Sequence, residues 1–172
     1  HAGDVVIENF STGVMANFGL DYESVKRPDL IYCSTSVYGR TGPFQKRLGY
    51  DPVVQAESGF MSLTGHPHQE PMRTAIPMVD VSTGLTGGVG VLAALYHRKR
   101  TGEGQFLEVP LFDTGFAQTG MHATGYMLDG TVPTRLGNGD YYLHPVGRYA
   151  CDDGYIAVAV DTDAQFAALC ET

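Results

Sequence analysis

Asp80 is the residue of this sequence whose setting points most directly to covalent chemistry. It stands where a proline-containing loop, AIPMVD, turns into an expected helix over residues 81–98. A carboxylate here can cap the helix by accepting hydrogen bonds from its first backbone N–H groups, which is the commoner role. It can also act as a nucleophile, because a helix N-terminus favours the ionised form that attack requires. Local sequence leaves both roles open.

Two other groups of side chains are candidates for binding ligands. Arg40, Lys46 and Arg47 lie in the glycine- and proline-containing segment 38–51 of an acidic chain. We expect a loop there, whose cations are either solvated or form a clamp for a phosphate or carboxylate. His66 and His68 form a His-x-His pair, but no third or fourth ligand stands at a familiar spacing, so no metal site is predicted.

Short apolar runs rich in β-branched residues predict the strands that position these side chains. Residues 4–8 and 30–37 are expected to be buried parallel strands, joined through short helices over 14–19 and 22–26. A third strand is expected over 106–111. Strand, helix and strand recurring within about 35 residues are typical of a βαβ unit, so the predicted fold class is α/β.

Longer helices are expected over residues 52–63, 81–98 and 112–128. Asp51 is the expected N-cap of the first of these helices. The second carries an apolar face at three- and four-residue steps, formed by Leu85, Val89, Leu92 and Tyr96. Its four glycines cost helix stability, which indicates that another backbone or a ligand comes close.

The composition changes near residue 133, where we place a domain boundary. Beyond it, residues 149–160 predict a hairpin that turns at Asp152-Asp153-Gly154. Residues 163–170 predict a helix with Phe166 and Leu169 facing inward. Residues 1–133 are therefore assigned to a larger domain, and residues 134–172 to a linker and the start of a smaller one.

Composition narrows the class of protein. The 172 residues are 43% apolar and 17% charged, as in a packed globular domain, and the net charge of −8 argues against a nucleic-acid or membrane surface. Cys33, Cys151 and Cys170 are far apart and form no CxxC motif, which argues against disulfides or zinc and for a reducing cytoplasm. We find no apolar run of the roughly 20 residues that a membrane span needs.

Several motifs in a fixed order carry a family resemblance. They are VIENF, SVYGRTGPF, GYD, IPMVD, LAALYHRKRTGEGQ, GNGD and DDGYIAVAV. With these motifs in this order, the chain resembles the family III CoA-transferases, which include formyl-CoA transferase and carnitine CoA-transferase. The 2-methylacyl-CoA racemases are related to this family. The resemblance implies a Rossmann-like parallel sheet in the large domain, a smaller α/β domain and an interlocked homodimer. It also implies that this chain is a central fragment of a longer protein.

The resemblance assigns the nucleophile to Asp80 and an aromatic position beside CoA to Tyr50. The racemases have a histidine where Tyr50 stands, and that histidine acts as a proton-transfer base. A tyrosine side chain ordinarily ionises only near about pH 10 and is a poor base at neutral pH. The residue at this position therefore favours a transferase over a racemase.

Other site residues follow from the same resemblance. CoA contacts are implied at Asn9, Phe10, Leu48, Gly49, Tyr50 and Asp51. Gly137, Asn138 and Gly139 resemble the start of a glycine-rich loop that closes over the active site. The chain departs from the family where Ser11-Thr12 replaces an arginine-proline pair and where Asn17 replaces an arginine. We expect Arg40, Lys46, Arg47 or residues outside this chain to replace the missing cations.

The function implied is transfer of CoA from an acyl-CoA thioester to an acceptor carboxylic acid. The resemblance implies an aspartyl mixed anhydride and an aspartyl-CoA thioester on Asp80, with oxyanions stabilised by backbone N–H groups near Asp80 and in the Gly137 loop. CoA thioester is then a substrate, and no permanent cofactor, metal, nucleic acid or membrane partner is expected. The alternatives are a 2-methylacyl-CoA racemase or epimerase, and a non-catalytic acyl-CoA-binding fragment.

Overall fold

The computed structural model describes residues 3–171, which divide into two compact units. One unit comprises residues 3–61 and 73–131, and the other comprises residues 62–72 and 132–171. The segment 62–72 thus groups with the C-terminal part of the chain. The assignment of 1–133 and 134–172 to two domains of the whole protein stays a prediction.

The first unit is built on a parallel sheet of three strands in the order β1–β2–β3. The strands are β1 (Val5–Glu8), β2 (Ile31–Ser36) and β3 (Phe106–Pro110). The predicted α/β class with a parallel sheet is therefore confirmed. Because the three strands are parallel, their carboxyl ends meet at one edge, which is where open α/β sheets bind ligands.

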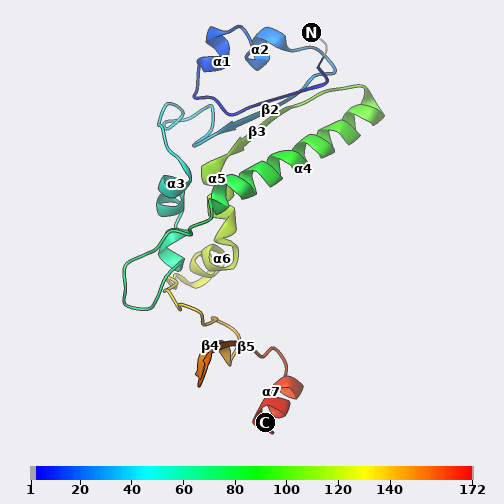
Figure 1. Ribbon diagram of the computed structural model, residues 1–172. Coiled ribbons are helices and arrows are strands. Elements are labelled where there is room, and N and C mark those ends of the chain that lie inside the picture. Colours follow the sequence, from blue (N-terminus) through cyan, green and yellow to red (C-terminus); the bar gives the residue numbers. More distant parts are fainter. Residues whose placement is uncertain (1–2, 172) are drawn as a thin grey trace. The chain divides into compact units, whose positions relative to one another are not determined.

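One face of the sheet is covered by aromatic packing. Helices α1 (Val14–Asn17) and α2 (Tyr22–Val25) connect β1 to β2 and lie on the side of the sheet away from α4 (Figure 1). The ring centroid of Tyr22 lies 5.8 Å from that of Tyr32 and 5.0 Å from that of Phe106. These rings join α2 to the two strands β2 and β3.

Helix α4 (Met78–Thr101) covers the other face of the sheet through small residues (Figure 1). A Cβ atom built on Gly87 would lie 3.6 Å from the Sγ atom of Cys33, and one on Gly90 would lie 3.6 Å from a Cδ1 atom of Leu107. The sheet is therefore the close neighbour that these two glycines indicated. Gly84 and Gly88 have no such neighbour among the described residues.

The predicted apolar face of α4 is not the face that packs on the sheet. The residues of α4 that are buried are Val79, Thr83, Gly87 and Ala94. The larger apolar residues are exposed, and these are Val81, Leu85, Val89, Leu92 and Tyr96. Apolar periodicity in the sequence identifies the helix face that carries large side chains. Close packing of α4 on the sheet instead requires small side chains at the contact, so the face with small residues is the buried one.

Helix α4 also meets the length and composition requirements of a membrane span. It has 24 residues, with a mean hydropathy of 1.5 in its most apolar window. The search for a long apolar run in the sequence did not identify it. The core helix of a soluble protein passes the same test, so this single helix is weak evidence for a membrane.

The remaining helices of the first unit are shorter than predicted. The expected helix 52–63 is α3 (Asp51–Glu57) followed by a 3₁₀ turn (Met61–Leu63), and Gly59 between them has φ +86°. The expected helix 112–128 divides into α5 (Leu111–Gln118) and α6 (Gly120–Asp129). Helix α3 packs closely on α5, because a Cβ atom on Gly115 would lie 3.0 Å from a Cγ1 atom of Val54.

The second unit contains the predicted hairpin and terminal helix. Strands β4 (Val146–Cys151) and β5 (Gly154–Ala159) pair antiparallel. Helix α7 (Asp163–Cys170) begins with a capping box between Thr162 and Gln165. Phe166 and Leu169 were expected to face inward but are exposed in the described chain, because the hairpin does not cover them.

Candidate active site

A cavity of about 900 Å³ opens at the carboxyl edge of the sheet, within the first unit. Asn9 and Phe10 line it just after β1, Tyr38 lines it just after β2, and Leu111 follows β3. Asp80, in the first turn of α4, lines the same cavity. Parallel strands therefore bring these separate loops to one place.

Most of the residues predicted from the family resemblance meet at this cavity. Its lining includes Asn9, Phe10, Leu48, Gly49, Tyr50 and Asp80. The side chains of Phe10, Leu48 and Tyr50 are each more than half exposed. An open cavity with apolar and aromatic walls can take a ligand that would cover these side chains.

Asp80 does not cap its helix. Helix α4 begins earlier than predicted, with Pro77 at the N-cap position and no side-chain cap, so Asp80 is the third helical residue. The capping role considered for Asp80 is therefore wrong. Its carboxylate is free to face the cavity.

The capping role belongs instead to Asp51, from another helix. The Oδ2 atom of Asp51 accepts hydrogen bonds from the backbone N–H of Val79 at 2.8 Å and of Asp80 at 3.1 Å. Asp51 is only 2% exposed and is absent from the cavity lining. Its predicted role as N-cap of α3 is wrong, because Tyr50 holds that position. The side chain reaches α4 because the two helices pack together.

The surroundings of Asp80 make its carboxyl group more basic. Partial burial raises its pKa above the ordinary value of 3.8, and the neighbouring Asp51 carboxylate raises the pKa further. These effects oppose the helix N-terminus, which was expected to favour ionisation. Nucleophilicity rises with basicity, so a carboxylate with a raised pKa attacks better once it is ionised.

The backbone N–H groups beside Asp80 are all in use. Those of Val79 and Asp80 donate to Asp51, and that of Val81 donates to the carbonyl of Pro77 at 3.0 Å. The expectation that N–H groups next to Asp80 stabilise oxyanions is therefore wrong for these three. Donors for a developing oxyanion have to come from other parts of the protein.

Gln55 is a site residue that sequence reasoning missed. Its Nε2 atom donates to Asp51 Oδ1 at 2.6 Å and to Thr74 Oγ1 at 3.1 Å, and its Oε1 atom accepts from the Thr74 N–H at 2.9 Å. It is fully buried, at 0% exposure. This amide joins Asp51 to the loop that leads into α4. The available signal was its position four residues after Asp51 on one helix face.

The three cations of the 38–51 loop differ in the number of hydrogen bonds and ion pairs that they make with other protein groups. Arg40 is held in a buried network. Arg47 pairs with Glu57 and lies 5.2 Å from the ring centroid of Tyr38. Lys46 lines the cavity and makes no hydrogen bond or ion pair in the part of the chain that the structure describes. Lys46 is thus the cation best placed to meet an incoming anion.

Gly49 lets the 38–51 loop approach the end of β2. A Cβ atom there would lie 3.0 Å from the Cγ1 atom of Val37 and 3.4 Å from the Tyr38 hydroxyl. A side chain at position 49 would therefore press on the side chains of Val37 and Tyr38.

Gly137, Asn138 and Gly139 belong to the second unit. Gly137 has φ +63°, and its N–H donates to the carbonyl of Gly65 at 3.0 Å. The Gly139 N–H donates to the carbonyl of Leu136 at 3.0 Å, which closes a tight turn. The predicted closure of this loop over Asp80 stays a prediction. In residues 3–171, no group of three or more His, Cys, Asp or Glu side chains is arranged to hold a metal ion.

The family match, the related sequences and a solved structure all connect this chain with CoA-transferases or with the CaiB/BaiF family. The sequence matches CoA-transferase family III over residues 1–172. It is 42% identical over 97% of its length to succinate–glutarate CoA-transferase of Agrobacterium fabrum, and 36% identical over 98% to acetyl-CoA:oxalate CoA-transferase of Acetobacter aceti. A crystal structure of a CaiB/BaiF family protein from Brucella suis covers 98% of the chain, with a TM-score of 0.88 and 40% identity.

The chain spans less than half of each of these proteins. It covers 42% of the Agrobacterium enzyme, 44% of the Acetobacter enzyme and 45% of the Brucella chain. The family match nevertheless extends along the whole sequence, and the structural match includes the sheet and the cavity elements described above. The chain belongs to the family III CoA-transferases.

Proposed function

We propose that the protein containing this chain transfers CoA from an acyl-CoA thioester to a carboxylic acid through Asp80. A carboxylate oxygen of Asp80 attacks the thioester carbonyl, the C–S bond breaks, and CoA leaves as its thiolate. The thiolate then attacks the aspartyl carbonyl of the mixed anhydride, which releases the donor acid and leaves CoA on Asp80 as a thioester. An acceptor carboxylate reverses these steps, which regenerates the Asp80 carboxylate.

The observation that carries this proposal is that Asp80 faces a large cavity while Asp51 caps its helix. A carboxylate that capped its own helix would have its oxygens occupied by N–H groups. Here the cap is supplied by Asp51, and partial burial and the Asp51 charge raise the pKa of Asp80. Both features suit a nucleophile.

The same cavity provides the proposed contacts for CoA. Phe10, Leu48 and Tyr50 supply exposed apolar and aromatic surface, and Lys46 supplies a positive charge for a phosphate. Two relatives are named for succinate and glutarate and for oxalate. We therefore propose small dicarboxylic acids as the acceptor class. Closure of the Gly137–Gly139 loop would exclude water and protect the anhydride from hydrolysis.

Trapping of the covalent intermediate tests the proposal. The whole protein is incubated with succinyl-CoA and hydroxylamine, digested, and analysed by mass spectrometry. An Asp80 hydroxamate that is absent from the Asp80→Ala variant is expected. An adduct on another residue, or full transferase activity in Asp80→Ala, would contradict the assignment. Exchange of an α-proton for deuterium in heavy water without an acceptor acid would indicate a racemase instead.

The remaining features of the family are proposed for the whole protein. They are a Rossmann-like large domain, an interlocked homodimer and a cytoplasmic location. Light scattering of the whole protein should give twice the mass of its chain. A monomer that is fully active would exclude a dimer-dependent site.

A further inference from the structure

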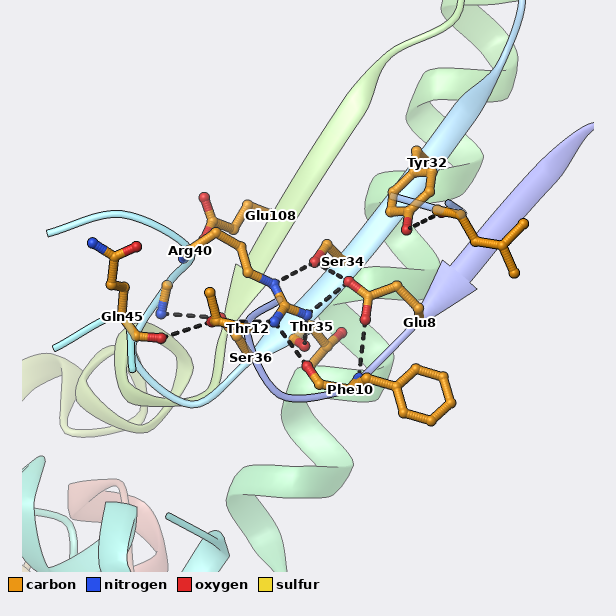
Figure 2. A network of polar contacts seen from close by, with 12 residues as sticks. Glu8, Phe10, Thr12, Tyr32, Ser34, Thr35, Ser36, Arg40, Gln45 and Glu108 are labelled. Carbon is orange, nitrogen blue, oxygen red and sulfur yellow. Dashed lines mark hydrogen bonds and ion pairs between the residues drawn. The ribbon is translucent and has the colours of Figure 1, made fainter. Parts of the chain in front are cut away.

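Arg40 reaches from the loop after β2 into the end of the sheet, where protein atoms occupy every N–H of its guanidinium. An arginine side chain has five such donors and no acceptor. The acceptors are Glu8 Oε1 at 2.7 Å, Thr35 O at 2.9 Å, Ser34 Oγ at 2.8 Å, Phe10 O at 2.7 Å and Thr12 Oγ1 at 3.4 Å. Figure 2 shows the guanidinium between these groups. No donor is left for a bound anion.

The network around Arg40 is largely buried. The side chain of Arg40 is 17% exposed and that of its ion-pair partner Glu8 is 4% exposed. Glu8 is held in turn by the hydroxyl of Ser34 and by the Phe10 N–H at 2.9 Å. Removal of one member of a buried ion pair leaves an uncompensated charge, which is strongly unfavourable. Arg40 is therefore fixed in place and does not act as the anion clamp considered for its loop.

The network holds together two segments that line the cavity. Arg40 binds the carbonyl of Phe10, in the turn after β1. Thr12, in the same turn, donates its hydroxyl to the carbonyl of Gln45 at 2.7 Å, in the loop that leads to Lys46 and Tyr50 (Figure 2). The Arg40 backbone N–H is held by Glu108 of β3. One side chain thus ties the 9–12 turn and the 40–50 loop to the sheet.

We infer that Arg40 is a positioning residue for acyl-CoA: its five hydrogen bonds set the spacing between the 9–12 turn and the 40–50 loop. This inference rests on the proposed function, because that function places CoA between these two segments. Arg40 lines the cavity, but protein atoms accept all five of its guanidinium hydrogen bonds, so it acts through the segments it holds. Thr12 belongs to the same hydrogen-bond network, at a position where the family commonly has proline.

The test compares Arg40→Lys with Arg27→Lys in the whole protein. Lysine keeps the positive charge but has three donors on one atom and cannot bridge the same acceptors. Arg27 is the control, because it also bonds a carboxylate and a carbonyl but lies outside the cavity lining. CoA affinity is measured by titration calorimetry, and kcat and KM are measured for acyl-CoA and for the acceptor acid.

For Arg40→Lys, the Kd of CoA and the KM of acyl-CoA should rise about tenfold, because charge-assisted hydrogen bonds that hold both segments are lost. The kcat and the acceptor KM should change by less than about threefold, and Arg27→Lys should match the wild type. A folded Arg40→Lys variant with unchanged CoA affinity, or with a loss confined to kcat, would overturn the inference. A wild-type protein that binds no CoA would overturn the proposed function as well.

Thr12→Val provides a second variant, because it removes one hydroxyl and leaves the buried ion pair intact. It should raise the Kd of CoA by about three- to fivefold, because the bond to Gln45 at 2.7 Å and the longer one from Arg40 at 3.4 Å are both lost. Combined with Arg40→Lys it should add less than its separate effect, since both residues act through one network. If Arg40→Lys does not fold, the Kd of CoA for Thr12→Val tests the inference by itself. Unchanged CoA affinity in Thr12→Val would then refute the inference.

Discussion

The backbone N–H of Asp80 donates a hydrogen bond of 3.1 Å to Oδ2 of Asp51, a residue 29 positions earlier in the chain. One buried carboxylate thereby satisfies the start of α4 and places a negative charge near a second carboxylate. The first effect fixes the backbone of the proposed nucleophile. The second raises the pKa of its side chain.

Asp80→Asn should abolish CoA transfer and still stabilise the fold at neutral pH. The pKa of the Asp80 carboxyl is raised in the folded state, so the folded protein binds its proton more tightly than the unfolded chain does. Its ionised form is therefore destabilising above the folded pKa, and the variant removes that cost. The variant should melt at a higher temperature than the wild type at pH 7.

The pH dependence of melting provides the control for that result. Below the ordinary pKa of 3.8 both states carry a protonated Asp80, so the two melting temperatures should converge. A variant that melts lower than the wild type at pH 7 would show that the Asp80 charge is not destabilising.

Asp51→Asn should move the acid limb of the pH–rate profile to lower pH. Attack requires an ionised Asp80, so kcat/KM falls as pH drops through the raised pKa of that carboxyl. Removal of the Asp51 charge removes one cause of the increase, and the profile of log kcat/KM against pH reports the shift. An acid limb that stays in place would mean that burial alone sets the pKa of Asp80.

Gln55→Leu should destabilise the protein by about 2–4 kcal/mol, because buried polar groups lose their partners. Leucine leaves Asp51 Oδ1 and the Thr74 N–H without the amide that now bonds both. The matched control is Gln118→Leu, at an exposed position of α5, with an expected change below about 0.5 kcal/mol. Urea unfolding measures both variants, and equal midpoints would contradict the role assigned to Gln55.

Gly104→Ala should prevent normal folding, whereas Gly88→Ala should stabilise the protein. A Cβ atom on Gly104 would lie 2.0 Å from the carbonyl oxygen of Leu30, a backbone atom that cannot move aside. Gly88 has nothing within 4 Å, so alanine there adds up to about 1 kcal/mol through helix propensity. Circular dichroism during urea unfolding distinguishes the two, and a folded Gly104→Ala protein of normal stability would contradict this packing.

Lys46→Gln should weaken CoA binding about two- to fivefold, the range of an exposed ion pair. Its dissociation constant should also depend less steeply on salt, since one screened charge pair is lost. Lys46→Arg keeps the charge and should bind CoA as the wild type does. Titration calorimetry at two salt concentrations measures both properties, and a Lys46→Gln variant with unchanged affinity would remove Lys46 from the CoA site.

Elements defined by local signals could be predicted from the sequence. The parallel strands β1 and β2 follow from short β-branched runs, and the β4–β5 hairpin follows from the DDG turn. The motifs also identified Asp80, Tyr50 and the Asn9–Phe10 turn, which line one cavity. In each case the deciding information lies within a few neighbouring residues.

Features that depend on distant partners could not be predicted in this way. Asp51 was assigned to its own helix because nothing in the local sequence shows that α4 begins beside it. Arg40 resembled a free cation until the fold placed Glu8 and the Phe10 carbonyl around it. The buried face of α4 depends on the flat sheet beneath it, which favours glycine and alanine over leucine.

The cap that Asp51 provides also links the dynamics of two helices. A helix that carries its own cap can fray and re-form by itself, but the first turn of α4 relies on an acceptor held by α3. Local unfolding of α3 would expose the amide protons of Val79 and Asp80 to hydrogen exchange at the same moment. The proposed nucleophile can therefore be no more persistently ordered than α3.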